Sequence, residues 1–198
     1  MKIFNDTFGV NANTFYERFQ KDFSKFYKNC QLEKPLFHYL LNGNSVSIQA
    51  IKGIGNKQIQ KDKIVLVFEN DQIEVSGESE LYPELFKIVS TFTRYLLDEH
   101  YNFRLNRLKN EILLFTSILE KHNRKYNYKY RMLLENELPY ICNDIELLLG
   151  NLKANHLKKL IEKVSFERGV NKVSDDIIAA FEKILEEADK RMISISKL

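Results

Sequence analysis

A chain of 198 residues with 44% hydrophobic and 29% charged residues has the composition of a folded globular protein, which excludes a largely disordered one. Its net charge of +3 is too small to indicate an anionic partner by itself. Neither cysteine belongs to a C-x-x-C pair, and no stretch reaches the roughly 18 uninterrupted apolar residues of a membrane helix. We therefore expect a cytoplasmic protein that has no contact with a membrane and whose thiols, Cys30 and Cys142, are buried.

The first element that the sequence predicts is a helix beginning at Thr14. Glu17 follows three residues later, which is the spacing of a capping box, where each side chain bonds the other residue's backbone amide. Aromatic residues then recur at helical spacing and predict one core-facing stripe: Phe15, Phe19, Phe23, Phe26 and Tyr27.

Alternating or continuous apolar residues predict three strands, over residues 46–50, 63–68 and 73–75. The turn residues at 69–72 favour an antiparallel hairpin between the last two strands. The glycine-containing stretch KGIGNK, residues 52–57, leads into a strand and not into a helix whose N-terminus could hold phosphate, so we interpret it as a connection between strands. The prediction is a three-stranded meander packed against the aromatic helix.

Long helices are expected after residue 80, because no glycine or proline occurs between Pro83 and Pro139. Pro83 suits the first residue of a helix. An apolar stripe follows, with a polar interruption at 98–107, so either one helix covers 84–121 or two helices meet near residues 101–102. The residues assigned to the stripe are Leu85, Ile88, Phe92, Leu96 and Phe103, continued by Leu108, Ile112, Phe115 and Leu119. Further predicted helices cover residues 126–137, 139–149 and 153–168, and Gly150 and Gly169 are placed as C-caps.

Together these elements predict a helix-rich α+β fold. An N-terminal helix and a small antiparallel three-stranded sheet are followed by long helices that form a bundle or an extended hairpin. We assign the mixed part to residues 1–80 and the helical part to residues 81–198, and the two can pack as one domain.

No sequence motif indicates a catalytic residue, a cofactor or a metal. The segment Asp98-Glu99-His100 is the nearest approach to a cluster of ligands. Adjacent side chains on a helix point about 100° apart, so these three do not converge on one ion. We predict a solvated helix face there. An enzyme whose site is assembled from distant residues stays a third alternative for the function.

The segment KHNRKYNYKYR, residues 121–131, combines five Lys or Arg with three Tyr and contains no acid. Cations for phosphates and rings for stacked bases are typical of surfaces that bind single strands or RNA. The candidate contacts to DNA or RNA are Lys121, Arg124, Lys125, Tyr126, Lys129, Tyr130 and Arg131, supplemented by Lys153, Lys158, Lys159 and Lys163. In the opposing interpretation the tyrosines pack together, and the acids of residues 132–150 neutralise the cations.

The stretch RGVNKVSDDIIAAFEKILEE, residues 168–187, combines features of a helix start. Ser174 is a strong N-cap, two acids complement the helix dipole, and Val170–Val173 form a short extended link. Over residues 157–190 this pattern is similar to the first half of the archaeal histone fold, a resemblance that implies phosphate contacts at Lys172 and at the amides around Ser174. Only half of that fold is matched, and we interpret the stretch as a helix start.

The predicted function is that of a non-catalytic protein-interaction or regulatory protein that acts through its helical half; the alternative is nucleic-acid binding. A continuous helix over the apolar stripe would span roughly 50 Å, which is longer than a monomer of this size is wide. Apolar residues would then project, and a symmetric dimer would cover them. The predicted self-association residues are Leu108, Ile112, Phe115 and Leu119, and the expected partners are a second copy or another protein.

Overall fold

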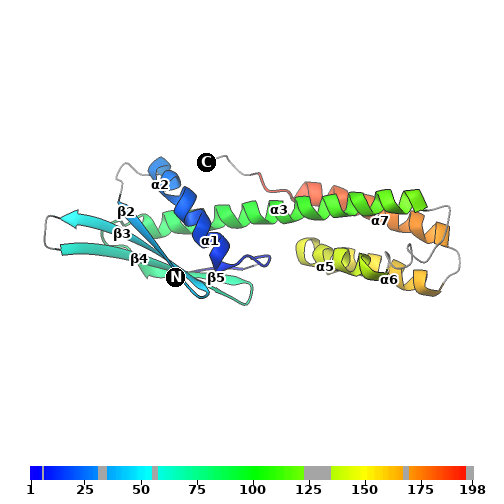
Figure 1. Ribbon diagram of the computed structural model, residues 1–198, viewed down its shortest axis with the longest axis horizontal. Coiled ribbons are helices and arrows are strands. Elements are labelled where there is room, and N and C mark those ends of the chain that lie inside the picture. Colours follow the sequence, from blue (N-terminus) through cyan, green and yellow to red (C-terminus); the bar gives the residue numbers. More distant parts are fainter. Residues whose placement is uncertain (6, 31–34, 55–57, 123–134, 167–169, 195–198) are drawn as a thin grey trace. The chain divides into compact units, whose positions relative to one another are not determined.

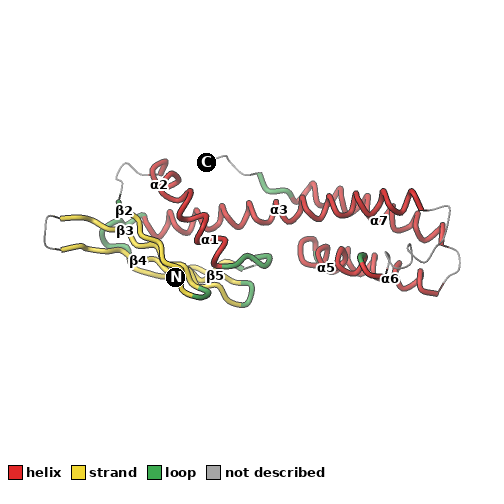
Figure 2. Tube along the Cα trace, in the orientation of Figure 1, coloured by secondary structure: helices red, strands yellow, loops and turns green. Residues whose placement is uncertain are grey.

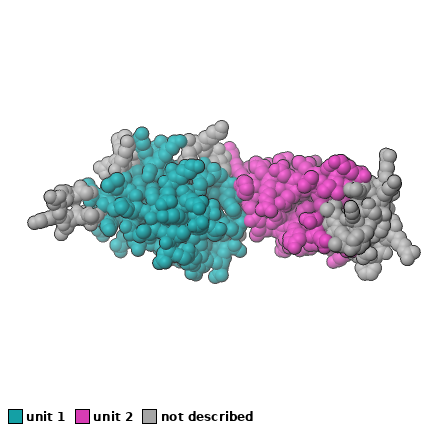
Figure 3. All heavy atoms as spheres, viewed as in Figure 1, with its two compact units in different colours: residues 1–100, 195–198 teal, residues 101–194 magenta. Residues whose placement is uncertain are grey.

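The computed structural model describes the chain except for residues 6, 31–34, 55–57, 123–134, 167–169 and 195–198. The described residues form two compact units, Met1–His100 and Tyr101–Ser194 (Figure 3). Unit 1 contains a sheet and helices, and unit 2 contains helices, so the predicted combination of α and β structure is confirmed (Figure 1). The helical part begins near residue 80, as the composition indicates, whereas the units divide at residue 100.

Figure 2 shows the strands of unit 1 in yellow. They form one sheet that is antiparallel throughout and has five strands in the order β1-β5-β4-β3-β2. Its strands are β1 (Lys2–Phe4), β2 (Leu36–Asn42), β3 (Ser45–Ile54), β4 (Gln58–Glu69) and β5 (Gln72–Glu78). The predicted strands are present as β3, β4 and β5, but the prediction of only three strands is wrong. β2 carries large apolar residues on both faces, which removes the alternation of polarity that reveals a strand, and β1 is only three residues long.

Two-residue turns join the strands at one end of the sheet. Asn70 and Asp71 connect β4 to β5 with φ angles of 49° and 57°, the positive values that a type I′ turn requires at both positions. The hairpin predicted at residues 69–72 is therefore confirmed. In the β2–β3 turn, the Asn44 side chain donates a hydrogen bond to the Phe68 carbonyl at 3.0 Å, which ties this turn to the end of β4.

The N-terminal helical segment consists of α1 (Ala12–Arg18), a π-helical turn (Phe19–Phe23) and α2 (Ser24–Cys30). The predicted start at Thr14 is wrong, because Asn11 is the N-cap and its side chain accepts the Thr14 amide at 3.0 Å. Asn is at least as good an N-cap as Thr, so the helix begins directly after Asn11, the earlier of the two residues. Cys30 is exposed at the end of α2, so the prediction of two buried thiols holds only for Cys142.

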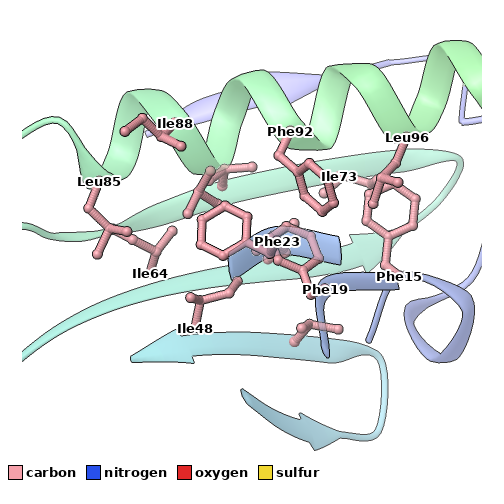
Figure 4. Close-up of a cluster of buried hydrophobic side chains, with 14 of the residues drawn as sticks. Phe15, Phe19, Phe23, Ile48, Ile64, Ile73, Leu85, Ile88, Phe92 and Leu96 are labelled. Atoms are coloured by element: carbon pink, nitrogen blue, oxygen red, sulfur yellow. The ribbon is translucent and has the colours of Figure 1, made fainter. Parts of the chain in front are cut away.

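The core of unit 1 lies between the sheet, the N-terminal helical segment with its aromatic stripe, and the first half of α3 (Leu85–His122). Figure 4 shows Phe19 and Phe23 pointing toward Phe92 of α3, and the ring centroids lie 4.9 and 5.3 Å from that of Phe92. The predicted aromatic stripe is thus confirmed as core, with Phe26 half-buried beside Phe92.

α3 is one helix of 38 residues, which confirms the first of the two alternatives for residues 84–121. Pro83 lies in the turn before it and is not its first residue. The buried Asp62 holds this turn: its carboxylate accepts the backbone amides of Glu80, Leu81 and Tyr82 at 2.9, 3.1 and 2.8 Å. A carboxylate that accepts charge-assisted bonds from consecutive amides fixes the direction in which α3 leaves the sheet.

Unit 2 contains the second half of α3 together with α5 (Leu138–Leu149), α6 (Asn151–Phe166) and α7 (Val170–Arg191). Gly150 ends α5 with a φ of 94° and donates its amide to the Glu146 carbonyl at 3.0 Å, as predicted for a C-cap. The predicted helix over 126–137 falls mostly outside the described residues, and Gly169 falls outside them entirely. None of the described helices is long and apolar enough to cross a membrane.

The start predicted at Ser174 is wrong. α7 begins at Val170, so the predicted extended link over 170–173 is helical and Ser174 lies inside the helix. An N-cap preference is worth about 1 kcal/mol, which does not stop a helix when the preceding residues tolerate helical geometry.

Candidate protein-interaction groove

The segment Asp98-Glu99-His100 lies on α3, and each of its three side chains contacts a different partner. Asp98 pairs with Arg94 at 2.8 Å, Glu99 pairs with Arg18, and the His100 ring lies 3.2 Å from the Phe8 carbonyl oxygen. The three side chains therefore do not converge, as predicted. In the part of the chain that the structure describes, no three His, Cys, Asp or Glu residues are grouped so that they could hold a metal ion.

Electrostatics around these residues follow from the ion pairs. Burial alone would lower the pKa of Arg18, but its hydrogen bonds to Glu99 and Asp22 outweigh burial and raise that pKa. Burial raises the pKa of Asp98, while the Arg94 guanidinium opposes this shift. These groups are paired charges at the surface of unit 1.

Of the residues predicted to contact nucleic acid in the basic segment, the structure describes only Lys121, which is exposed. The other six, Arg124, Lys125, Tyr126, Lys129, Tyr130 and Arg131, lie outside the described residues. Two of the acids expected to neutralise them have other partners: Asp144 pairs with Arg104 of α3, and Glu146 pairs with Lys158 of α6. Nucleic-acid binding at residues 121–131 stays a prediction.

The four residues predicted to mediate self-association are buried within unit 2: Leu108, Ile112, Phe115 and Leu119. α7 supplies part of their cover, since the Phe115 ring meets that of Phe181 edge-on with a centroid distance of 5.9 Å. The argument that a second copy must cover this stripe is therefore wrong, because the same chain covers it. Self-association itself stays a prediction.

A groove runs between the second half of α3 and α5, with a volume of about 600 Å³. Its lining includes the buried side chains of Phe115 and Ile141. Two large side chains that line it are exposed to solvent: Leu114 of α3 by 66% and Tyr140 of α5 by 73%. Much of the groove is thus apolar and open to solvent.

Charged residues also line the groove. Arg104 bonds Asp144 at 2.9 Å, and Arg107 bonds Glu111 at 2.8 Å, a hydrogen bond that raises the pKa of Arg107. Glu137 lies at the start of α5 and has no ion pair with any described residue. Among the described residues, two arginines and three carboxylates line the groove, which gives this lining a formal charge of −1.

The sequence contained a signal for this groove. Ile112-Leu113-Leu114-Phe115 are four consecutive apolar residues on a helix. Because successive side chains are about 100° apart, such a run cannot lie on a single buried face. Ile112 and Phe115 are buried, and the two leucines between them are exposed. What the sequence did not show is that Tyr140 of α5 lines the same groove as Leu114.

A second cavity, of about 410 Å³, lies in unit 1 at the hairpin turns and the start of α1. Two of its amide side chains already have structural partners, since Asn11 caps α1 and Asn44 bridges two turns. We therefore assign this cavity to the framework of unit 1.

Comparisons with protein-family models, with curated proteins and with solved structures found no match to this chain. The resemblance of residues 157–190 to archaeal histones has no support from a family model, and its extended link is helical here. The groove is consequently interpreted from its own geometry.

Proposed function

We propose that this is a non-catalytic protein-interaction protein whose helical unit binds an apolar segment of another protein in the groove between α3 and α5. The observation that carries the proposal is the exposure of Leu114 and Tyr140 beside the apolar floor formed by Phe115 and Ile141. Exposed apolar side chains gathered beside charged ones are typical of protein interfaces.

The dimensions and charge of the groove indicate the kind of partner. A volume of about 600 Å³ accommodates a few large side chains and not a broad protein surface. An amphipathic helix presents such anchors at i, i+3, i+4 and i+7 and fits a groove between two helices. The formal charge of −1 and the carboxylate of Glu137 favour a partner segment with a basic residue next to its apolar anchors.

Site-specific photo-cross-linking tests the proposal. A benzophenone amino acid replaces Leu114 in the full chain, which is expressed in cells that make the protein naturally. The matched control carries the same group at Leu152, an α6 residue that is 88% exposed and does not line the groove. We expect a discrete cross-linked polypeptide from position 114 and none from position 152. The same products from both positions, or no polypeptide from position 114, would refute the proposal.

Two charge variants extend the test to the unmodified chain. Leu114→Asp should abolish co-purification of the cross-linked polypeptide, while Leu152→Asp should retain it, because both positions are exposed and tolerate a charge. Co-purifying nucleic acid would instead favour the alternative function. Its affinity should then fall with salt with a log–log slope of roughly −3 to −4.5, and it should be lost when Arg124, Lys125, Lys129 and Arg131 are replaced by Ser.

A further inference from the structure

The edge strand β2 in unit 1 exposes backbone and apolar side chains together. β2 pairs only with β3, so the backbone groups on its other side have no strand partner among the described residues. Leu36 is 70% exposed and Leu40 is 53% exposed. The rings of Phe37 and Tyr39 pack toward Phe23 at 5.1 and 6.5 Å, so the exposed leucines lie on the face of the sheet that the helices do not cover.

The two edges of the sheet differ in how they are protected. Natural proteins block edge strands with charges, prolines, bulges or very short strands, because an open edge pairs with other chains. The β1 edge has three residues and includes Lys2, so it is short and charged. β2 has seven residues, LFHYLLN, and contains no Lys, Arg, Asp, Glu or Pro. Its regular register with β3, from Leu36↔Ile51 to Asn42↔Ser45, contains no bulge.

The sequence of β2 is complementary to itself in an antiparallel arrangement. If a two-fold axis passes beside His38, Leu36 of one copy lies opposite Leu40 of the other, and Phe37 lies opposite Tyr39. On the outer face leucine then faces leucine on either side of the two His38 side chains, which meet each other at the axis. On the inner face aromatic residues face aromatic residues, and both kinds are favourable cross-strand pairs. β2 contains no Lys, Arg, Asp or Glu, so the pairing opposes none of these charges.

We propose that β2 is a self-association surface, at which a second copy of this chain pairs antiparallel to it about His38 and joins two five-stranded sheets into one. Self-association was expected from the sequence at the helical half, and this proposal places it in unit 1 instead. This interface is in unit 1 and does not depend on the groove of unit 2.

The length of β2 indicates how tightly the proposed dimer associates. A single seven-residue strand buries less area than the roughly 1,200–2,000 Å² of stable complexes, so we expect a dimer that dissociates at micromolar concentrations. Light scattering at tens of micromolar should give a mass between monomer and dimer that falls on dilution. A monomer mass at all concentrations up to that range would overturn the proposal.

Cysteine cross-linking tests the register. In a background with Cys30→Ser, which removes the exposed thiol, His38→Cys places two thiols directly opposite each other across the two-fold axis. Opposed Cβ atoms in antiparallel strands are about 4.5–5.5 Å apart, close to disulfide geometry. The matched control is Asn42→Cys on the same strand, whose two copies would be roughly 27 Å apart at about 3.3 Å per residue. Mild oxidation should produce a reducible dimer from position 38 and leave position 42 monomeric.

Equal cross-linking at positions 38 and 42 would overturn the register and with it the proposal. A charge variant gives an independent result without cysteine. Leu40→Lys puts a cation on the exposed edge and should raise the dimer dissociation constant at least tenfold, whereas Leu152→Lys on α6 should leave it unchanged. The same effect from both substitutions would overturn the proposal, and retained cross-linking at Leu114 in the Leu40→Lys chain would show that the groove acts separately.

Discussion

In unit 1, α3 is buried over a wide arc, whereas in unit 2 the same helix is buried along a narrow stripe. The first half buries Leu85, Ile88, Val89, Ser90, Phe92, Thr93, Leu96 and Leu97. The second half buries only every third or fourth residue: Tyr101, Leu105, Leu108, Ile112, Phe115 and Leu119. A sheet together with aromatic helices covers more of the helix than other helices do, and what unit 2 leaves uncovered includes Leu113 and Leu114, the second of which lines the groove.

The difference in burial between the two halves of α3 should have its largest effect on the free energy of unfolding when a side chain is truncated to alanine. The Phe92 ring lies within 4.9–6.0 Å of the rings of Phe19, Phe23, Phe26 and Tyr95. Phe92→Ala should therefore lower the free energy of unfolding by about 3–5 kcal/mol, because it removes a buried ring and leaves a cavity. Urea unfolding followed by circular dichroism measures the loss.

Leu113→Ala on the same helix is the matched control, since Leu113 is exposed. It should change the free energy of unfolding by no more than about 0.5 kcal/mol. A loss at Leu113 comparable to that at Phe92 would mean that the two halves of α3 are covered alike, contrary to the comparison.

Substitution of one carboxylate in each unit should show the same difference between the units, with a smaller loss of stability. Asp62 in unit 1 accepts three backbone amides, and Asp62→Ala leaves those donors without their acceptor, so we expect a loss of about 3 kcal/mol. Asp62→Asn keeps one oxygen and should lose less. Asp144→Asn in unit 2 disrupts a partly exposed pair with Arg104 and should lose about 1 kcal/mol or less. Thermal or urea unfolding of the three variants would contradict this order if Asp144→Asn proved the most damaging.

The smallest expected effect concerns the two thiols, one in each unit. Cys30 is exposed, while burial raises the pKa of Cys142 to about 11. At pH 8 a disulfide reagent should react with one thiol quickly, and with the second only after unfolding, because the thiolate is the reactive form. Cys30→Ser should remove the fast phase. Two fast thiols in the native protein would show that α5 does not bury Cys142.

The raised pKa of Cys142 also has a consequence for alkaline stability. Above the ordinary thiol pKa, the unfolded chain loses a proton that the folded chain retains up to a pH of about 11. Stability should therefore decline across that window by a contribution that is absent in Cys142→Ala. Unfolding midpoints between pH 8 and 10, compared for the two chains, measure this contribution.

Local conformational preferences were sufficient to predict several elements of the fold. The absence of glycine and proline predicted long helices after residue 80, with a single helix over 84–121 as one of two alternatives. The Asn70-Asp71 pair predicted the hairpin, and Gly150 was placed correctly as a C-cap. Each of these depends on the conformational preferences of residues that are neighbours in sequence, and such preferences act wherever the segment lies.

The sequence did not show which of several possible N-cap residues starts a helix. Asn11 and Thr14 are both good N-caps, and the helix uses the first. Ser174 is a good N-cap within a segment that is already helical. β2 was missed because its outward positions hold leucines, so no alternation of polarity distinguishes it from a buried segment.

By itself the sequence determined that α3 carries an apolar stripe, because a helix repeats every 3.6 residues. It placed Phe103 on that stripe, where the structure leaves it 65% exposed, and it left out the buried Leu105. It did not determine what covers the stripe. Only the tertiary structure decided that the sheet and the aromatic segment enclose residues 85–97, and that α7 contributes to the cover of Phe115 and leaves Leu114 open. Burial depends on elements distant in the chain, and the periodicity of one helix contains no information about which of them will pack against it.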